Sequence, residues 1–89
     1  MTSVLAPSFL AQFAALPGEV QELARKNYKL WKSNPTHPSL HFKHVGKRTQ
    51  SFSVRIGISW RAVGVQHGDT IIWFWIGSHA DYDRLLVSL

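Results

Sequence analysis

The sequence contains no cysteine, so no disulfide network can hold its fold together. Charge is also scarce: Asp, Glu, Lys and Arg make up 17% of the chain, whereas hydrophobic residues make up 45%. Soluble domains usually contain about 25% charged residues. We therefore expect one domain spanning residues 1–89, in a reducing compartment, with some apolar surface that is covered by a partner.

Long apolar runs and an N-terminal positive charge are both missing. Residues 1–19 contain no Lys or Arg, and Pro7 and Pro17 interrupt them, which disfavours a secretory signal peptide. No apolar stretch reaches the roughly 20 residues that cross a bilayer as a helix. We expect a cytoplasmic protein that is not embedded in a membrane.

Acidic residues are outnumbered by basic ones. The chain has 10 Lys and Arg against 5 Asp and Glu, a formal net charge of +5 and a pI near 10.1. A small basic domain attracts polyanions such as nucleic acid, an anionic membrane or an acidic protein. A basic surface that serves solubility alone has the same composition, so the charge must be considered together with motifs.

Several catalytic motifs are absent as well. The sequence has no glycine-rich phosphate loop, no cysteine nucleophile and no pair of carboxylates suited to acid–base catalysis. His37, His41 and His44 are close in sequence, but the odd spacing of His41 and His44 directs them to opposite faces of a strand. A zinc site needs ligands that converge. We therefore expect no metal and no other cofactor.

The N-terminal part of the sequence predicts a short edge strand at residues 2–6, followed by two helical segments. Ser8 is a candidate N-cap for the first helix, and Pro17 separates it from the second. Apolar residues of the second helix form one stripe at helical spacing: Val20, Leu23, Ala24, Leu30 and Trp31. Prolines within residues 33–38 end this helix. The two segments predict a helical hairpin.

From Leu40 onward, apolar residues alternate with a period of two. Strands are predicted at residues 40–45, 51–57, 60–66 and 70–76. Short turns join them, so we expect antiparallel hairpins. The predicted fold is α+β, with the helical hairpin packed on one face of a small antiparallel sheet. The other face is partly open and carries Lys43, Arg55 and Arg61.

Three cations and one imidazole can converge on this open face. His79 follows the apolar strand 70–76 after Gly77 and Ser78, and the strand forms a rigid platform for it; we expect residues 81–86 to form a short helix or tail beside the cleft. Arg and Lys stabilise the negative charge that a phosphodiester gains during its cleavage. A histidine can exchange a proton with a ribose hydroxyl near neutral pH.

Each of these residues also has a structural interpretation. Arg55 can be a solvated strand residue, and His79 can be the cap of the last helix. Arg61 can be packed and paired with Asp69 or Asp81. The convergence of all of them on one face favours the functional interpretation.

Residues 34–43, NPTHPSLHFK, and residues 73–83, WFWIGSHADYD, carry a resemblance to a known family. Together with the order of helices and strands, they resemble the RelE/ParE superfamily of bacterial type II toxins over nearly the whole chain. The ending is most similar to the ParE-like and HigB-like branches, and its GSHA to the C-terminal motif of YafQ-like toxins. The resemblance implies a microbial-ribonuclease-like fold and a cognate antitoxin that forms a hetero-oligomer with the toxin.

The resemblance also implies an activity. RelE-like members enter the ribosomal A site and cleave mRNA through attack by a 2′-hydroxyl. If this carries over, the catalytic residues are His79, Arg61, Arg55 and Tyr82. The residues that contact the RNA are then Lys43, His41, Lys47 and Arg48. The sequence lacks the lysine cluster and the clear catalytic glutamate of RelE itself, so the resemblance does not identify the general base.

Two other functions are compatible with the same resemblance. ParE members share the fold but inhibit DNA gyrase, and a degenerate member would be a non-toxic binding module. A gyrase inhibitor has no need of an imidazole at position 79. His79 therefore favours the ribonuclease over the gyrase inhibitor.

Overall fold

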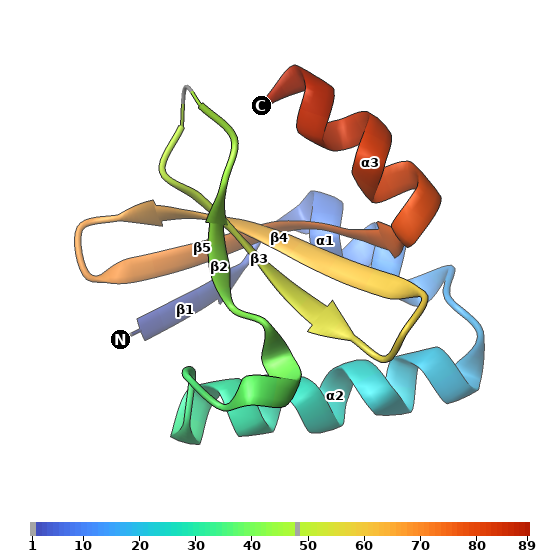
Figure 1. Ribbon diagram of the computed structural model, residues 1–89. Coiled ribbons are helices and arrows are strands. Elements are labelled where there is room, and N and C mark those ends of the chain that lie inside the picture. The colour runs from blue at the N-terminus through green and yellow to red at the C-terminus, as the bar shows by residue number, and fades with distance from the viewer. Residues whose placement is uncertain (1, 48) are drawn as a thin grey trace.

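Residues 2–47 and 49–89 are described in a computed structural model of the chain (Figure 1). Strand β1 (Thr2–Leu5) precedes helices α1 (Pro7–Ala14) and α2 (Gly18–Ser33). A 3₁₀ turn, η1 (Pro38–Leu40), leads to strands β2 (Lys43–Val45), β3 (Ser51–Ile56), β4 (Trp60–His67) and β5 (Thr70–Ser78), followed by helix α3 (His79–Ser88). Within these described residues, no helix combines the length and apolar composition needed to cross a bilayer.

The strands form one five-stranded sheet in the order β1-β5-β4-β3-β2. Strands β2 to β5 pair antiparallel, as their short turns predict, whereas β1 runs parallel to β5. The expectation of an entirely antiparallel sheet is therefore wrong at this edge. Two helices and three strands separate β1 from β5 in the chain, so no hairpin constrains their relative direction.

The strand predicted at residues 40–45 begins later than expected. Leu40 belongs to η1, and His41 adopts a left-handed backbone conformation with a φ of 46°. Pairing with β3 begins at Lys43, opposite Ser53. Leu40 is fully buried, so its apolar character reflects a turn that is anchored in the core.

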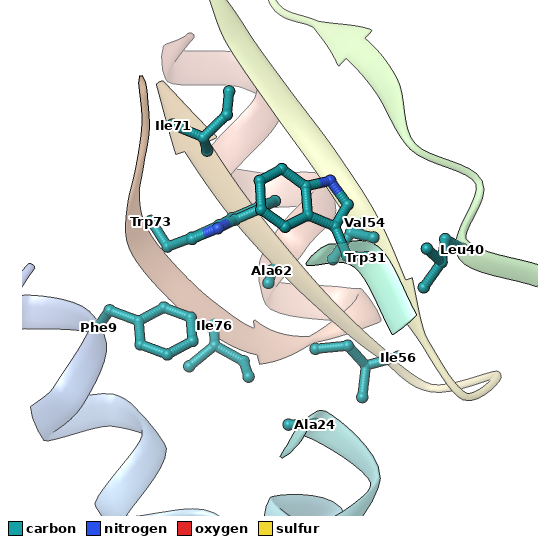
Figure 2. Close-up of a cluster of buried hydrophobic side chains, with 10 residues drawn as sticks. All are labelled: Phe9, Ala24, Trp31, Leu40, Val54, Ile56, Ala62, Ile71, Trp73 and Ile76. Carbon is teal, nitrogen blue, oxygen red and sulfur yellow. The ribbon is translucent and has the colours of Figure 1, made fainter. Parts of the chain in front are cut away.

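The helical hairpin covers one face of the sheet, as predicted. Between them lies a cluster of buried side chains (Figure 2): Phe9, Ala24, Trp31, Leu40, Val54, Ile56, Ala62, Ile71, Trp73 and Ile76. Trp31 of α2 meets Trp73 of β5 edge-on, with ring centroids 5.3 Å apart. Aromatic pairs in this geometry stabilise a core beyond the area they bury. The first helix, however, is capped by Ala6 without a side-chain bond, and Ser8 Oγ instead donates to the carbonyl of Phe74 at 2.7 Å.

Helix α3 covers part of the opposite face, so that the sheet lies between α2 and α3 (Figure 1). The buried Tyr82 donates a hydrogen bond from its hydroxyl to Ser53 Oγ at 3.0 Å. Ser51 and Ser53 are consequently buried on a face that the sequence predicts to be partly open. The part that stays uncovered is the end of β3 and β4 that carries Arg55 and Arg61.

Gly64 of β4 provides a test of the packing around Trp73. A Cβ at this position would lie 2.7 Å from Ile71 Cγ2 and 2.9 Å from Trp73 Cε3. We predict that Gly64→Ala lowers the free energy of unfolding by about 1–3 kcal/mol, the usual cost of overpacking. Gly18→Ala is the control, because a Cβ at Gly18 meets nothing within 4 Å. Urea unfolding compares the variants, and equal stability of the two would contradict the close packing at Gly64.

Candidate functional site

The uncovered end of the second sheet face contains an open hollow of about 700 Å³. Its walls come from β3, β4, the end of β5, the start of α3 and two loops: His41, Arg55, Ile58, Ser59, Arg61, Ser78, His79 and Ala80. Four of the residues that the sequence singles out, His41, Arg55, Arg61 and His79, therefore line one concave site.

Arg55 and Arg61 face each other across the ladder between β3 and β4. They are directly paired residues of antiparallel strands, and the Cβ atoms of such a pair lie about 5 Å apart. Like charges in this position destabilise a sheet. Among the described residues, neither guanidinium has a carboxylate within ion-pair distance. The pair is therefore unfavourable by itself, and an anion bound between the two cations would offset the repulsion.

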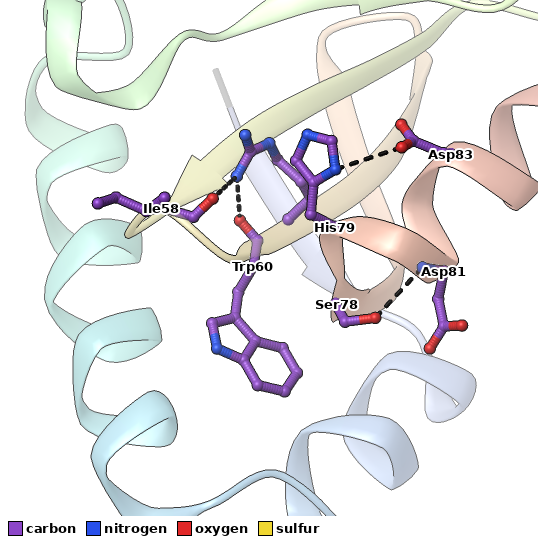
Figure 3. A network of polar contacts seen from close by, with 7 residues as sticks. Ile58, Trp60, Ser78, His79, Asp81 and Asp83 are labelled. Carbon is purple, nitrogen blue, oxygen red and sulfur yellow. Dashed lines mark hydrogen bonds and ion pairs between the residues drawn. The ribbon is translucent and has the colours of Figure 1, made fainter.

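Backbone carbonyls hold both guanidiniums in place. Arg61 Nη1 donates to the carbonyls of Ile58 at 3.2 Å and Trp60 at 2.7 Å (Figure 3). Arg55 Nε donates to the carbonyl of Gly57 at 3.0 Å. Nη2 of each arginine makes no hydrogen bond within the described part of the chain. The turn between β3 and β4 thus orients both side chains and leaves donors for a ligand.

The electrostatic environment of Arg61 is unfavourable for a cation. Burial lowers the pKa of Arg61, and the positive charge of Arg55 lowers it further, against opposing effects of Tyr82 and Asp83. Arginine keeps its charge throughout the physiological pH range. The lowered pKa therefore reflects first the cost of burying this cation and then its repulsion by Arg55, both of which a bound phosphate would offset.

His79 is the first residue of α3 and lies at the rim of the hollow. Nδ1 of its half-exposed ring is 3.3 Å from Asp83 Oδ2, one helical turn further on (Figure 3). Ser78 Oγ accepts a hydrogen bond from the backbone N–H of Asp81 at 3.2 Å, so Ser78 is the N-cap of α3. The structural interpretation of His79 as the cap is therefore wrong, and its imidazole is available to a ligand.

His41 reaches the hollow from the loop after η1. Its Nε2 accepts a hydrogen bond from Arg55 Nη1 at 3.5 Å. This contact brings the His41 ring against the guanidinium of Arg55. The hollow thus contains two imidazoles and two guanidiniums from separate segments of the chain.

Tyr82 and Lys43 lie outside the lining of the hollow. The Tyr82 hydroxyl is engaged by Ser53, and the guanidinium carbon of Arg61 lies 6.0 Å from the centre of the Tyr82 ring. This geometry suits a cation–π contact that supports Arg61 from beneath. Lys43 is exposed on β2, in register with Ser53.

Lys47 lies at the opposite end of α3. Its backbone N–H donates to the carbonyl of Leu89 at 3.3 Å, in the turn between β2 and β3. The structure therefore separates Lys47 from the hollow, although the sequence groups it with His41 as an RNA contact. Arg48, placed in the same group, lies outside the described residues.

The histidines near residue 40 do not come together as metal ligands. Nδ1 of His37 accepts a hydrogen bond from the backbone N–H of Ser39 at 3.2 Å, and His44 stacks edge-on against Phe52. Over residues 2–47 and 49–89, no group of three or more His, Cys, Asp or Glu side chains is placed to hold a metal ion.

Two features of the hollow escaped the sequence analysis. Asp83 contacts His79, and the i, i+4 spacing of the two residues could have indicated it, because such residues are neighbours on a helix. Ile58, 79% exposed, forms part of the rim. No pattern in the sequence distinguishes Ile58 from an apolar core residue.

The fold and the site define a class of protein: a small α+β domain with a cationic, histidine-containing hollow on a sheet face. Residues 18–84 match the family model for the ParE-like toxin domain. The chain belongs to this family, and thereby to the RelE/ParE superfamily of toxins that its sequence resembles. No protein with a curated description matches the chain.

Two solved structures share the fold. The RelB–RelE antitoxin–toxin complex from Methanococcus jannaschii contains a chain that matches with a TM-score of 0.71 and 20% identity, over 91% of this chain and 96% of the other. A copper-bound mutant toxin from Helicobacter pylori matches with a TM-score of 0.64 and 20% identity, over 91% of this chain and 97% of the other. At this identity the similarity establishes the α+β fold predicted from the sequence.

Inorganic phosphate provides a direct test of the hollow. We predict that titration with phosphate shifts the backbone NMR signals of Arg55, Arg61 and His79, because the unpaired guanidiniums bind the anion. The signal of Lys47 serves as the control. Arg61→Gln should weaken binding by about 10- to 100-fold, the effect of losing a hydrogen bond to a charged group. Shifts confined to the lysines of α2 would contradict the assignment.

Proposed function

We propose that the chain is the toxin of a toxin–antitoxin pair and a metal-independent endoribonuclease that cleaves mRNA on the ribosome. The observation that supports this most strongly is the unpaired Arg55–Arg61 pair beside the imidazole of His79. Membership of a toxin family supports the biological class. The RelB–RelE complex from Methanococcus jannaschii, which shares the fold, supports an antitoxin as the partner.

The chemistry is an internal phosphoryl transfer. A ribose 2′-hydroxyl loses its proton and attacks the adjacent phosphorus, a bond forms between phosphorus and the 2′-oxygen, and the bond to the 5′-oxygen breaks. The 5′-oxygen gains a proton, so the products are a 2′,3′-cyclic phosphate and a 5′-hydroxyl. The reaction needs no redox partner and consumes no water.

The residues of the hollow meet the two demands of this reaction. Arg55 and Arg61 stabilise the additional negative charge on the five-coordinate phosphorus, through donors that are already oriented by the β3–β4 turn. His79 exchanges a proton with the 2′-oxygen or the 5′-oxygen. Tyr82 positions Arg61. The hydrogen bond of its buried hydroxyl fixes the ring, and the guanidinium of Arg61 lies over that ring.

The ribosome as the place of cleavage is supported by the charge outside the hollow. Four cations of α2 are exposed to solvent: Arg25, Lys26, Lys29 and Lys32. Such a basic surface binds nucleic-acid backbones without regard to sequence. This helix lies on the side of the sheet opposite α3 (Figure 1), so its cations would contact a different part of a large RNA from the proposed contacts His41 and Lys43.

Substitutions in the hollow test the ribonuclease. We predict that His79→Ala abolishes cleavage and that Arg55→Ala and Arg61→Ala each lower its rate by about 10²–10³, as loss of a donor to a developing oxyanion does. Lys47→Ala is the control and should cleave at the wild-type rate. Single-turnover cleavage of mRNA on programmed ribosomes, with new 5′ ends mapped, provides the measurement. A His79→Ala variant that cleaves at the wild-type rate would exclude the mechanism.

Inhibition of DNA gyrase is the second candidate, because the matching family model is that of a ParE-like domain. A supercoiling assay beside the cleavage assay separates the two. Gyrase inhibition that persists in His79→Ala, without new RNA 5′ ends, would select this candidate. If the chain shows neither activity and is not toxic, the result would support the third possibility, an inactive binding module of the same fold.

A second surface suits the antitoxin. An apolar cavity of about 180 Å³ lies between α1, α2 and the sheet, and its lining includes Leu5, Phe9, Leu10, Phe13 and Tyr28. Leu10 is 51% exposed, so the cavity has an apolar rim. The apolar face of a partner helix can cover such a groove, while carboxylates of the same partner reach Arg55 or Arg61.

We predict that association with the antitoxin slows as salt rises, because the net charge of +5 steers an acidic partner towards the chain. Leu10→Asp should raise the dissociation rate by about tenfold or more, since it places a charge against a buried apolar contact. Stopped-flow kinetics at low and high salt resolve both rates. Association that is indifferent to salt would show that the partner does not approach the basic surface.

A further inference from the structure

We infer that Asp83 is a positioning residue, which holds Nδ1 of His79 and thereby presents Nε2 to the anion in the hollow. The catalytic consequence rests on the proposed ribonuclease function. The contact itself does not depend on that function, because it is a property of α3. The contact would orient His79 as the general base, a role that neither the sequence nor the resemblance assigns to a residue.

The geometry begins with the spacing on the helix. His79 and Asp83 are i, i+4 neighbours in the first turns of α3, and Nδ1 lies 3.3 Å from Oδ2 (Figure 3). A carboxylate is an acceptor only, and a neutral imidazole carries one N–H. We infer that Asp83 accepts a hydrogen bond from the Nδ1–H of the ring, which leaves the lone pair of the neutral imidazole on Nε2. An unprotonated Nε2 can accept the proton of a 2′-hydroxyl, and a protonated one can return it to the 5′-oxygen.

A second contact restrains the ring. The imidazole of His79 meets Tyr82 edge-on, with ring centroids 5.9 Å apart. Tyr82 is itself fixed by its bond to Ser53 and lies beneath Arg61. Asp83 thus contacts Nδ1 of the ring, while Tyr82, which the ring meets edge-on, also lies against the guanidinium of Arg61.

The charges around His79 explain why a carboxylate is needed. Arg55 and Arg61 line the same hollow from β3 and β4, and His41 enters from the loop after η1. The N-terminal end of α3 adds a partial positive charge, which also opposes an imidazolium. Asp83 is the acidic group that contacts His79 within the described part of the chain. It also acts on Arg61, whose pKa its charge raises.

Asp81 provides a matched control on the same helix. It pairs with Arg84 at 2.9 Å, and its side chain is exposed like that of Asp83. Residues two apart on a helix point in diverging directions, so Asp81 does not share the contact with His79. Asp81→Asn and Asp83→Asn remove the same charge from the same helix, but only the second removes the anchor of the imidazole.

The test uses the full chain and two readouts. Long-range ¹H–¹⁵N NMR reports which ring nitrogen of His79 carries the proton when the ring is neutral. We expect the Nδ1–H form in the wild type, in Asp81→Asn and in Asp83→Glu, which keeps a carboxylate. Asp83→Asn should shift the population towards Nε2–H, because an amide can donate to Nδ1.

Cleavage kinetics supply the second readout. Asp83→Asn should lower kcat by about 10- to 100-fold with little change in KM, the effect expected when the orienting partner of a histidine is lost. An unchanged tautomer in Asp83→Asn, or an equal loss of rate in Asp81→Asn, would overturn the inference. If no variant cleaves RNA, the proposed function fails, and the tautomer measurement still decides whether Asp83 positions His79, since it needs no substrate.

Discussion

The repulsion between Arg55 and Arg61 is the constraint on which the organisation of this protein depends. The two residues are paired across β3 and β4, and within the described part of the chain no carboxylate lies at ion-pair distance from either guanidinium. A sheet that carries such a pair loses stability unless an anion binds. The surrounding structure must therefore hold both cations in place before a ligand arrives, and the carbonyls of Gly57, Ile58 and Trp60 do so.

The remaining elements supply that support from both faces of the sheet. On one side, Trp31 and Trp73 anchor the helical hairpin against the strands. On the other side, α3 places Tyr82 against Ser53 and Arg61, so that a buried hydrogen bond fixes the ring on which the Arg61 guanidinium lies. Since α3 starts at His79, the same helix that supports the arginine also delivers the imidazole.

Strong local patterns allowed most of this fold to be predicted from the sequence. The apolar stripe of α2 and the alternation in β3 identified their buried faces, and with them the outward direction of Arg55. The parallel pairing of β1 and the left-handed turn at His41 were not predictable, because they depend on contacts between distant parts of the chain. The position of His79 after the apolar strand, together with the family resemblance, identified it as a candidate, but the proposed role of Asp83 emerges only when α3 is seen against the hollow.

The central claim is that the hollow binds a phosphodiester between the paired arginines. A crystal structure of the chain with a dinucleotide whose 2′-oxygen is methylated tests this most directly, because the methyl group blocks the attack and traps the intact substrate. We predict that the phosphate contacts Nη2 of both Arg55 and Arg61, with Nε2 of His79 within hydrogen-bond reach of the 2′- or 5′-oxygen. A phosphate bound instead along the lysines of α2, with the hollow occupied by solvent alone, would contradict the account.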